Sequence, residues 1–266
     1  MIHPTAIVSP EAVVAESAEI GPYCVVHAGA KVGEGCVLES HVVVHCGAVL
    51  GPRVRAKAFV ALGGDPQDLS FDRNLKTGIE IGEGCTFHEG CTIHRATHAE
   101  KPTRIGSFCL FMANSHVAHD CTVGDHVIFA NGALIGGHVR VEDFAFISGN
   151  SVVHQGCRVG ESVMLSGNSS TSMDIPPFCM AAGRNELHGL NIVGLRRRKF
   201  PTENIQQIKA FYFKLYGAQG NLAKLAQAEI ESNPNLCPQA LQFLQFFSGA
   251  HRGILHPVKK SRQNWQ

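Results

Sequence analysis

With 266 residues, 44% of them apolar, and a formal net charge of +1, the chain is long enough for one large domain and a smaller one. It begins without a secretory signal and has no apolar run of about eighteen residues, so we expect a cytoplasmic protein with reduced cysteines and no stable membrane insertion. Residues 191–266 hold 11 Lys/Arg and 3 Asp/Glu, which indicates an anionic partner for this segment.

An apolar residue recurs at every sixth position through most of the segment 1–190. The series begins with Ile2, Val8, Val14, Ile20, Val26, Val32, Leu38, Val44 and Leu50. A small or β-branched residue usually follows four positions later, so both positions are expected to point inward. Three such hexads make one triangular coil that stacks on the next. We therefore predict a mainly β fold, a parallel β-helix, over residues 1–190.

Seven cysteines occupy the small inward position of a hexad, and we interpret them as packing residues. They are Cys24, Cys36, Cys85, Cys91, Cys109, Cys121 and Cys157.

Two segments interrupt the series. Between Leu62 and Ile81 an insertion delays the next apolar position, which predicts a loop over residues 63–78 that carries Asp68. At residues 99–104 the spacing holds but the apolar residue is missing, which predicts a second loop. Loops that leave a rigid repeat often carry binding residues, so both are candidate parts of a site.

After Pro177 the hexads fade, and helical spacing replaces them from Thr202 onward. The apolar residues of the first expected helix are Ile205, Ile208, Phe211 and Leu215. Two further short amphipathic helices are expected near residues 222–225 and 241–247. We therefore predict a C-terminal α-helical domain over residues 191–266.

Histidines are frequent in the predicted coils, and His119 and His138 lie about one coil apart. Their imidazoles are therefore expected to share a cleft, which suits either metal binding or general base catalysis. The metal alternative would be a zinc site like that of γ-class carbonic anhydrases. Asp120 beside His119 and Asp68 on the loop favour a base that a carboxylate orients, so we predict no metal.

The segment over residues 114–124, NSHVAHDCTVG, resembles a signature of UDP-N-acetylglucosamine O-acyltransferases, which begin lipid A synthesis. Further similar segments, among them PQDL at residues 66–69 and VHQ at 153–155, extend the resemblance over nearly the whole chain. The resemblance implies a left-handed solenoid, a homotrimer, and transfer of a (3-hydroxy)acyl group to the 3-position of a UDP-amino sugar. The acyl group would arrive on the phosphopantetheine of acyl carrier protein, with no other cofactor.

The resemblance also implies roles for individual residues. His119 would be the general base, Asp68 the carboxylate that aligns it, and Gly137 the backbone donor to the oxyanion. The sugar and diphosphate would contact Asp120, His116, His138, His154 and Gln155. Asn191 and Arg197 would contact the nucleotide.

Two more roles follow from the same resemblance. Gly167 would leave the end of an acyl-chain groove open, although it could equally be a plain corner glycine. The basic residues Arg196, Arg198 and Lys199 would dock the acidic acyl carrier protein, against the alternative of a solvated charged face. Nucleic acid is not expected, because no aromatic platform accompanies these charges.

Three positions depart from the usual pattern of that family: Ser70, Val193 and Gly156. They leave open whether the acceptor is the 3-hydroxy sugar or its 3-amino analogue. The hexads are also compatible with a hexapeptide-repeat N-acyltransferase of the same pathway, with a coenzyme A-dependent acetyltransferase, and with a solenoid scaffold without catalysis.

Overall fold

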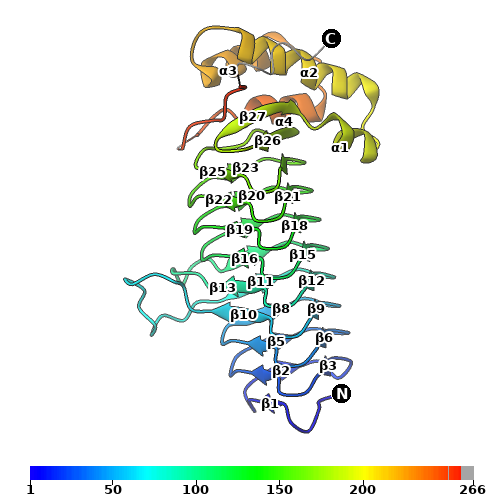
Figure 1. The fold of residues 1–266 in the computed structure, drawn as a ribbon, viewed down its shortest axis with the longest axis vertical. Helices are drawn as coiled ribbons and strands as arrows, with labels where there is room; N and C mark the ends of the chain where they lie inside the picture. The colour runs from blue at the N-terminus through cyan, green and yellow to red at the C-terminus, as the bar shows by residue number, and fades with distance from the viewer. Residues whose placement is uncertain (251, 259–266) are drawn as a thin grey trace.

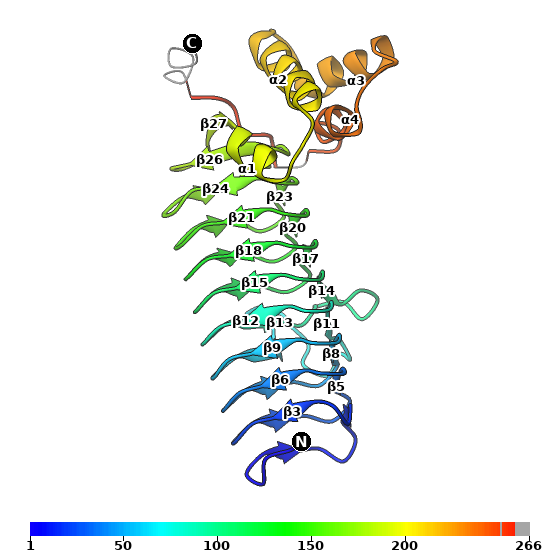
Figure 2. The same cartoon turned by 90° about the vertical axis from the view of Figure 1, so that its right-hand side faces the viewer.

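The structure, a computed structural model, describes residues 1–250 and 252–258. The chain winds into a left-handed β-helix with the shape of a three-sided prism, and a group of helices follows at its C-terminal end (Figures 1 and 2). Each full coil contributes one short strand to each of three sheets. This confirms the predicted mainly β fold, a left-handed parallel β-helix.

The three faces of the prism are sheets whose strands pair with the coil before and the coil after. The first face contains β1 (Ile7–Val8), β4 (Val25–Val26), β7 (Val43–Val44), β10 (Ala61–Gly64), β13 (Thr92–His94), β16 (His116–Val117), β19 (Leu134–Ile135), β22 (Val152–Val153) and β25 (Ser170–Thr171). The second face contains β2 (Val13–Val14), β5 (Lys31–Val32), β8 (Ala48–Leu50), β11 (Ile79–Ile81), β14 (Thr103–Ile105), β17 (Thr122–Val123), β20 (Arg140–Val141) and β23 (Arg158–Val159).

The third face ends in an antiparallel hairpin of its last two strands. It contains β3 (Glu19–Ile20), β6 (Val37–Leu38), β9 (Arg55–Ala56), β12 (Thr86–Phe87), β15 (Leu110–Phe111), β18 (Ile128–Phe129), β21 (Phe146–Ile147), β24 (Met164–Leu165), β26 (Cys179–Ala182) and β27 (Glu186–Leu190). Turns between faces form three corners. The first corner joins the first face to the second, the second corner joins the second to the third, and the third corner joins the third to the first.

The inward positions of the hexads form one continuous core along the prism. In its middle, Phe87, Phe111 and Phe129 stack with ring centroids 4.8 Å apart. The seven cysteines predicted to point inward are all buried free thiols. Burial raises the pKa of Cys121 to about 12, so this thiol stays protonated and serves as packing.

Both predicted interruptions are present. Residues 65–78 connect β10 to β11 without strand structure and project from the prism (Figure 1). Residues 95–102 connect β13 to β14 in the next coil. The backbone N–H groups of Ala96 and Thr103 both donate to the carbonyl of Gly78, so the two irregular segments lie against each other.

Helices α1 (Ile192–Arg197), α2 (Thr202–Gly217), α3 (Leu222–Ser232) and α4 (Pro238–Gln245) follow the last strand. The last three confirm the three helices predicted from apolar spacing, whereas α1 was not predicted as a separate helix. No helix in the described part of the chain is both long and apolar enough to cross a membrane.

The C-terminal segment does not stay within the helices. Ile254 pairs with Asp174 and Pro257 pairs with Leu187, so this segment returns to the end of the prism. The guanidinium of Arg158 bonds the buried carboxylate of Asp174 at 2.8 Å and also donates to the carbonyl of Phe246 just after α4. These contacts fasten the helices to the solenoid. The boundary at residue 190 coincides with the end of β27, but it stays a prediction as a domain limit.

Candidate active site

The coil length, three hexads, decides which side chains meet at the first corner. His119 occupies the same place in its turn as Gly137 and Gln155, while Asp120 occupies the place of His138 and Gly156. Asp120 and His138 have φ of 59° and 60°, left-handed values that Asp and His adopt more readily than most residues. His119 therefore faces a glycine in the next coil, and His138 lies against Asp120.

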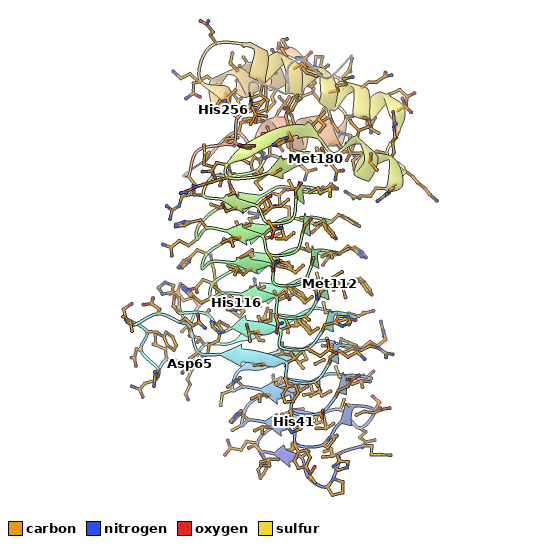
Figure 3. All side chains as sticks on the ribbon, viewed as in Figure 1. His41, Asp65, Met112, His116, Met180 and His256 are labelled. Carbon is orange, nitrogen blue, oxygen red and sulfur yellow. The ribbon has the colours of Figure 1, made fainter. Side chains whose placement is uncertain are left out.

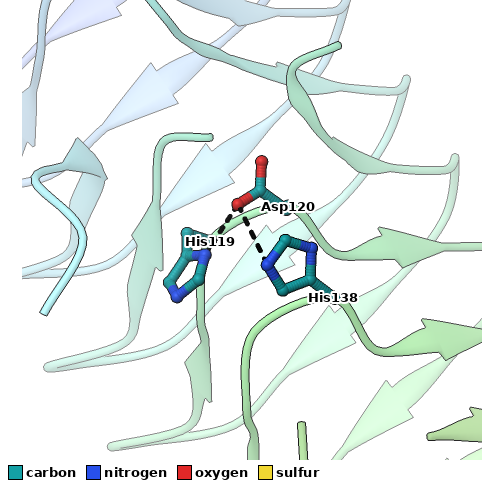
Figure 4. Close-up of side chains that lie close together, drawn as sticks. All are labelled: His119, Asp120 and His138. Carbon is teal, nitrogen blue, oxygen red and sulfur yellow. Dashed lines mark hydrogen bonds and ion pairs between the residues drawn. The ribbon is translucent and has the colours of Figure 1, made fainter. Parts of the chain in front are cut away.

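His119 and Asp120 form the closest polar pair of this corner. Nδ1 of His119 lies 2.7 Å from Oδ2 of Asp120, and Nε2 of His138 lies 3.7 Å from the same oxygen (Figure 4). The imidazoles of His119 and His138 meet edge to face with ring centroids 5.2 Å apart, which confirms that they share one cleft. The side chains of His119 and Asp120 are 16% and 9% exposed, so the pair is largely shielded from water.

Burial raises the pKa of Asp120, but hydrogen bonds from Thr97 and His119 outweigh burial and hold it below the usual carboxyl value. Asp120 is therefore ionised at neutral pH. An ionised carboxylate at Nδ1 favours the tautomer of His119 that carries its proton there. The other ring nitrogen, Nε2, is then free to accept a proton.

Position 137 must be a glycine because it lies directly against the ring of His119. A Cβ on Gly137 would lie 2.5 Å from Cε1 and 2.7 Å from Nε2 of His119, so any side chain would displace the ring. The backbone N–H of Gly137 donates to no other group in the described residues. It is thus available to a ligand, and the resemblance expects it to be the oxyanion donor.

Asp68 does not orient His119 in this chain, which corrects the prediction. The Asp68 carboxylate is fully exposed and accepts hydrogen bonds from the N–H and the hydroxyl of Ser70, both at 2.8 Å. These bonds lower the pKa of Asp68, and the charge of His119 contributes less to that shift. Asp120, predicted as a sugar ligand, takes the position at Nδ1 because it follows His119 in the same tight turn.

The other predicted sugar contacts gather around this pair. His116 stands on β16, and its Nδ1 lies 2.8 Å from the hydroxyl of Thr92. Burial, followed by the charge of His119, lowers the pKa of His116, so this ring is neutral at neutral pH. His154 and Gln155 belong to the first-corner turn one coil beyond Gly137. The structure therefore brings His116, His138, His154 and Gln155 to one edge of the prism.

The predicted nucleotide contacts lie elsewhere. Asn191 caps α1: its Oδ1 accepts from the N–H of Gly194, and its Nδ2 donates to the carbonyl of Ser162, both at 3.0 Å. Ser162 belongs to the second corner, so Asn191 and the neighbouring Arg197 on α1 are anchored away from the first corner of the same chain. Their contact with a nucleotide stays a prediction.

Arg198 corrects a second prediction, because its guanidinium is used inside the chain. It bonds Glu161 at 2.6 Å, bonds the hydroxyl of Ser162, and stacks on the ring of Phe144 at 3.6 Å. Arg198 is the C-cap of α1, and this position directs it inward while Arg196, Arg197 and Lys199 stay exposed. Arg198 is therefore a structural residue, unlike the exposed charges around it.

Gly167 lies at the third corner and is exposed. Its φ is not left-handed, and an added Cβ would meet only the carbonyl oxygen of Gly149, at an ordinary 3.5 Å. Neither backbone conformation nor crowding requires glycine there, and its place in an acyl-chain groove stays a prediction beside the plain corner explanation.

Two of the three departures from the family pattern have visible structural settings. Ser70 holds Asp68, as described above. Gly156, with φ 72°, leaves space that the guanidinium of Arg252 occupies, its Nε lying 3.3 Å from where a Cβ would stand. Val193 is exposed on α1, and nothing in the structure explains its identity.

His119, Asp120 and His138 could in principle hold a metal, because their ligand atoms lie within 4.8 Å of one another. Tetrahedral zinc with bonds of about 2.0 Å separates its ligand atoms by roughly 3.3 Å. The 2.7 Å between Nδ1 and Oδ2 is instead a hydrogen-bond distance. The pair is thus arranged as a base and its orienting carboxylate.

Three residues of the site were missed by sequence reasoning. Thr92 bonds His116, Arg95 bonds the projecting loop, and Thr97 bonds Asp120. All three belong to β13 or to the irregular segment after it. The missing apolar residue at residues 99–104 indicated an irregular segment near here, but it did not indicate which side chains turn toward the cleft.

Comparisons with known proteins show the family of the chain. A sequence profile described as UDP N-acetylglucosamine O-acyltransferase, domain 2, matches residues 174–255, and bacterial transferase hexapeptide repeats match residues 11–46 and 102–137. The acyl-carrier-protein-dependent UDP-N-acetylglucosamine O-acyltransferase of Thiobacillus denitrificans is 41% identical over 261 residues, which cover 96% of this chain and 98% of that protein.

Solved structures show the same relationship. UDP-N-acetylglucosamine acyltransferase from Francisella novicida superposes with a TM-score of 0.91 at 32% identity, covering 98% of this chain and 96% of the other. The Campylobacter jejuni enzyme gives a TM-score of 0.90 at 32% identity, covering 97% and 100%. The chain therefore belongs to the UDP-N-acetylglucosamine O-acyltransferase family.

Proposed function

We propose that this chain transfers a 3-hydroxyacyl group from acyl carrier protein to the 3-hydroxyl of UDP-N-acetylglucosamine, in lipid A synthesis. The observation that carries the proposal is the shielded pair of His119 and Asp120, with Nδ1 and Oδ2 2.7 Å apart and the His119 ring packed against Gly137 of the next coil. A base and an oxyanion donor side by side are what acyl transfer to a hydroxyl needs.

In the proposed reaction, Nε2 of His119 removes the proton of the sugar hydroxyl as its oxygen attacks the thioester carbonyl. The N–H of Gly137 stabilises the resulting oxyanion, and the charge of Asp120 stabilises the imidazolium. The tetrahedral intermediate collapses, the carbon–sulfur bond breaks, and His119 returns the proton to the leaving thiolate. The ester and the free phosphopantetheine thiol are the products, and no further cofactor enters.

We propose that the working unit is a homotrimer, as the resemblance implies. The residues expected to touch one substrate lie at three different corners of one chain: His119 at the first, Asn191 at the second and Gly167 at the third. Corners of neighbouring prisms must meet for a single ligand complex to reach all three. The projecting loop, in which Leu69 is fully exposed, supports this arrangement because it extends an apolar residue away from its own core.

Acyl carrier protein is proposed to dock on the exposed charges of α1 and the turn after it, Arg196 and Lys199. An acidic partner complements this cationic surface. The acyl chain is proposed to end near Gly167, where the absence of a side chain leaves room. A cytoplasmic location fits both substrates and is proposed with them.

The proposal is tested by a mass-resolved assay with acyl carrier protein thioesters of several chain lengths. Each thioester is offered with UDP-N-acetylglucosamine and, separately, with the 3-amino analogue. We expect an ester product from the first acceptor. A product from the 3-amino sugar alone would change the acceptor, and no transfer to either would reject the function. The variant Gly167→Met should shift the preference toward shorter chains.

The variant His119→Ala separates catalysis from a scaffold role. Removal of a general base should lower kcat by about 10²- to 10⁴-fold while the oligomeric state stays unchanged. Turnover equal to that of the unsubstituted protein would contradict the proposed mechanism. Metal analysis of the purified protein tests the zinc alternative at the same residues.

A further inference from the structure

Thr97 surrounds the Asp120 carboxylate with donors. Its backbone N–H donates to Oδ1 at 3.0 Å and to Oδ2 at 3.2 Å, and its hydroxyl donates to Oδ2 at 2.6 Å. Oδ2 is also the oxygen that lies 2.7 Å from Nδ1 of His119. One carboxylate oxygen therefore lies between the Thr97 hydroxyl and the imidazole.

The segment that carries Thr97 is held by hydrogen bonds on both sides of this residue. Thr103, at the start of β14, accepts a hydrogen bond from the N–H of Asp120 at 2.8 Å, and its side chain is fully buried. The N–H of Ala96, next to Thr97, is tied to the carbonyl of Gly78. Thr97 is thus held in place independently of any ligand.

Two donors on one carboxylate oxygen compete for its charge. A hydrogen bond from the Thr97 hydroxyl withdraws electron density that Oδ2 would otherwise offer to the Nδ1–H of His119. The carboxylate then stabilises the imidazolium form of His119 less than it would without the Thr97 hydroxyl. The efficiency of a general base depends on the match between its pKa and the working pH, so a residue that changes this match changes the rate.

We propose that Thr97 is a positioning residue that holds Asp120 toward His119 and tunes, through that carboxylate, the pH range in which His119 acts as a base. The inference rests on the proposed function of His119. It adds a third member to the pair, one that bonds the carboxylate of Asp120.

Other charged or titratable groups also act on this pair, and each must stay the same in a test. Those facing His119 or Asp120 are His138, His116, His94, Asp68 and Cys121, with His98 packed behind His138. Substitution of Thr97 changes none of them.

The test compares Thr97→Val, which removes the hydroxyl but keeps the shape and the N–H donors, with Thr97→Ser, which keeps the hydroxyl. The acid limb of the kcat/KM profile should move about one pH unit upward in Thr97→Val, the size expected for one hydrogen bond to a charged group. Activity at pH 7 should fall by up to about tenfold and recover at higher pH, whereas Thr97→Ser should retain the original profile.

A loss by the same factor at every pH would show a merely structural role and overturn the inference, as would an unchanged profile in Thr97→Val. A second measurement follows the His119 ring signals by NMR while pH is varied, with assignment from His119→Ala. The midpoint should move upward in Thr97→Val, and no movement would reject the role of Thr97. This readout decides the inference even if the unsubstituted protein transfers no acyl group, a result that would reject only the proposed function.

Discussion

Two regions bring a carboxylate near His119, and they are built in different ways. At the first corner, stacked turns fix Asp120 through the backbone, since the N–H of His138 donates to the carbonyl of His119 at 3.0 Å. The loop over residues 65–78 has no such ladder, and its Asp68 is exposed. The repeat therefore places His119 and Asp120 within hydrogen-bond distance of each other, while the loop offers an exposed carboxylate that can meet a ligand or a neighbouring subunit.

Neutralising each carboxylate in turn tests most directly whether Asp120 or Asp68 orients His119. Asp120→Asn should lower kcat about 100-fold, because an amide at Nδ1 no longer fixes the tautomer or stabilises the imidazolium. Asp68→Asn should change kcat less than about tenfold, because Asp68 makes no bond to His119. Steady-state kinetics on both variants, with the oligomeric state as control, measures the difference. Equal losses would return the orienting role to Asp68.

The side chain of Arg95, which follows β13, joins the loop to the prism. Its guanidinium bonds Asp65 at 2.9 Å and the carbonyl of Leu75 at 2.8 Å, and it lies over the ring of Phe71 (Figure 3 labels Asp65 near the base of the loop). Arg95→Met removes these bonds and should raise KM for the UDP-sugar about tenfold with little change in kcat.

Arg95→Lys is the matched control for the loop. A lysine can keep the ion pair with Asp65 but cannot reproduce the several N–H donors of the guanidinium. The KM of Arg95→Lys should therefore lie between that of the unsubstituted protein and that of Arg95→Met. Hydrogen exchange over residues 65–78 should rise in the same order. A kcat loss without a KM change would place the effect of Arg95 at the first corner instead.

The smallest expected effect is on stability and concerns His94, which lies on β13 with its ring against that of His116 on the neighbouring strand β16. Burial, and then the charges of His116 and His119, lower the pKa of His94 to about 4. An unfolded chain binds a proton there near pH 6.5, so between about pH 6.5 and 4 the unfolded state holds more protons than the folded state. The free energy of unfolding should therefore decrease as pH falls through this window.

His94→Gln removes this titration and should flatten the decrease. Urea unfolding at pH 7 and pH 5 measures the slope, with His154→Gln as an exposed control. An unchanged slope in His94→Gln would assign the acid sensitivity to other groups.

The hexad period predicted much of the molecule because it is a direct consequence of stacking. It placed the inward residues, the loop over residues 63–78, and the shared cleft of His119 and His138. The helices after Thr202 followed from apolar spacing. Family resemblance added expected roles for His119 and Gly137, which periodicity alone could not assign and which stay predictions.

Side-chain direction was the part that the sequence could not provide. From the sequence alone, Asp120 and Asp68 are equally plausible partners of His119. The left-handed backbone of Asp120, with φ 59°, turns its carboxylate toward the imidazole and decides between them. Arg198 resembles its basic neighbours in the sequence, but the end of α1 directs it onto Phe144 and Glu161. The role of Thr97 depends on a non-periodic segment folding back on the next coil.

A crystal structure of the protein with UDP-N-acetylglucosamine tests the central claim most directly. The account predicts the 3-hydroxyl oxygen within about 2.6–3.2 Å of Nε2 of His119, with Nδ1 still on Asp120. A 3-hydroxyl bound beside another residue, or Asp68 of any subunit in place of Asp120 at Nδ1, would contradict it.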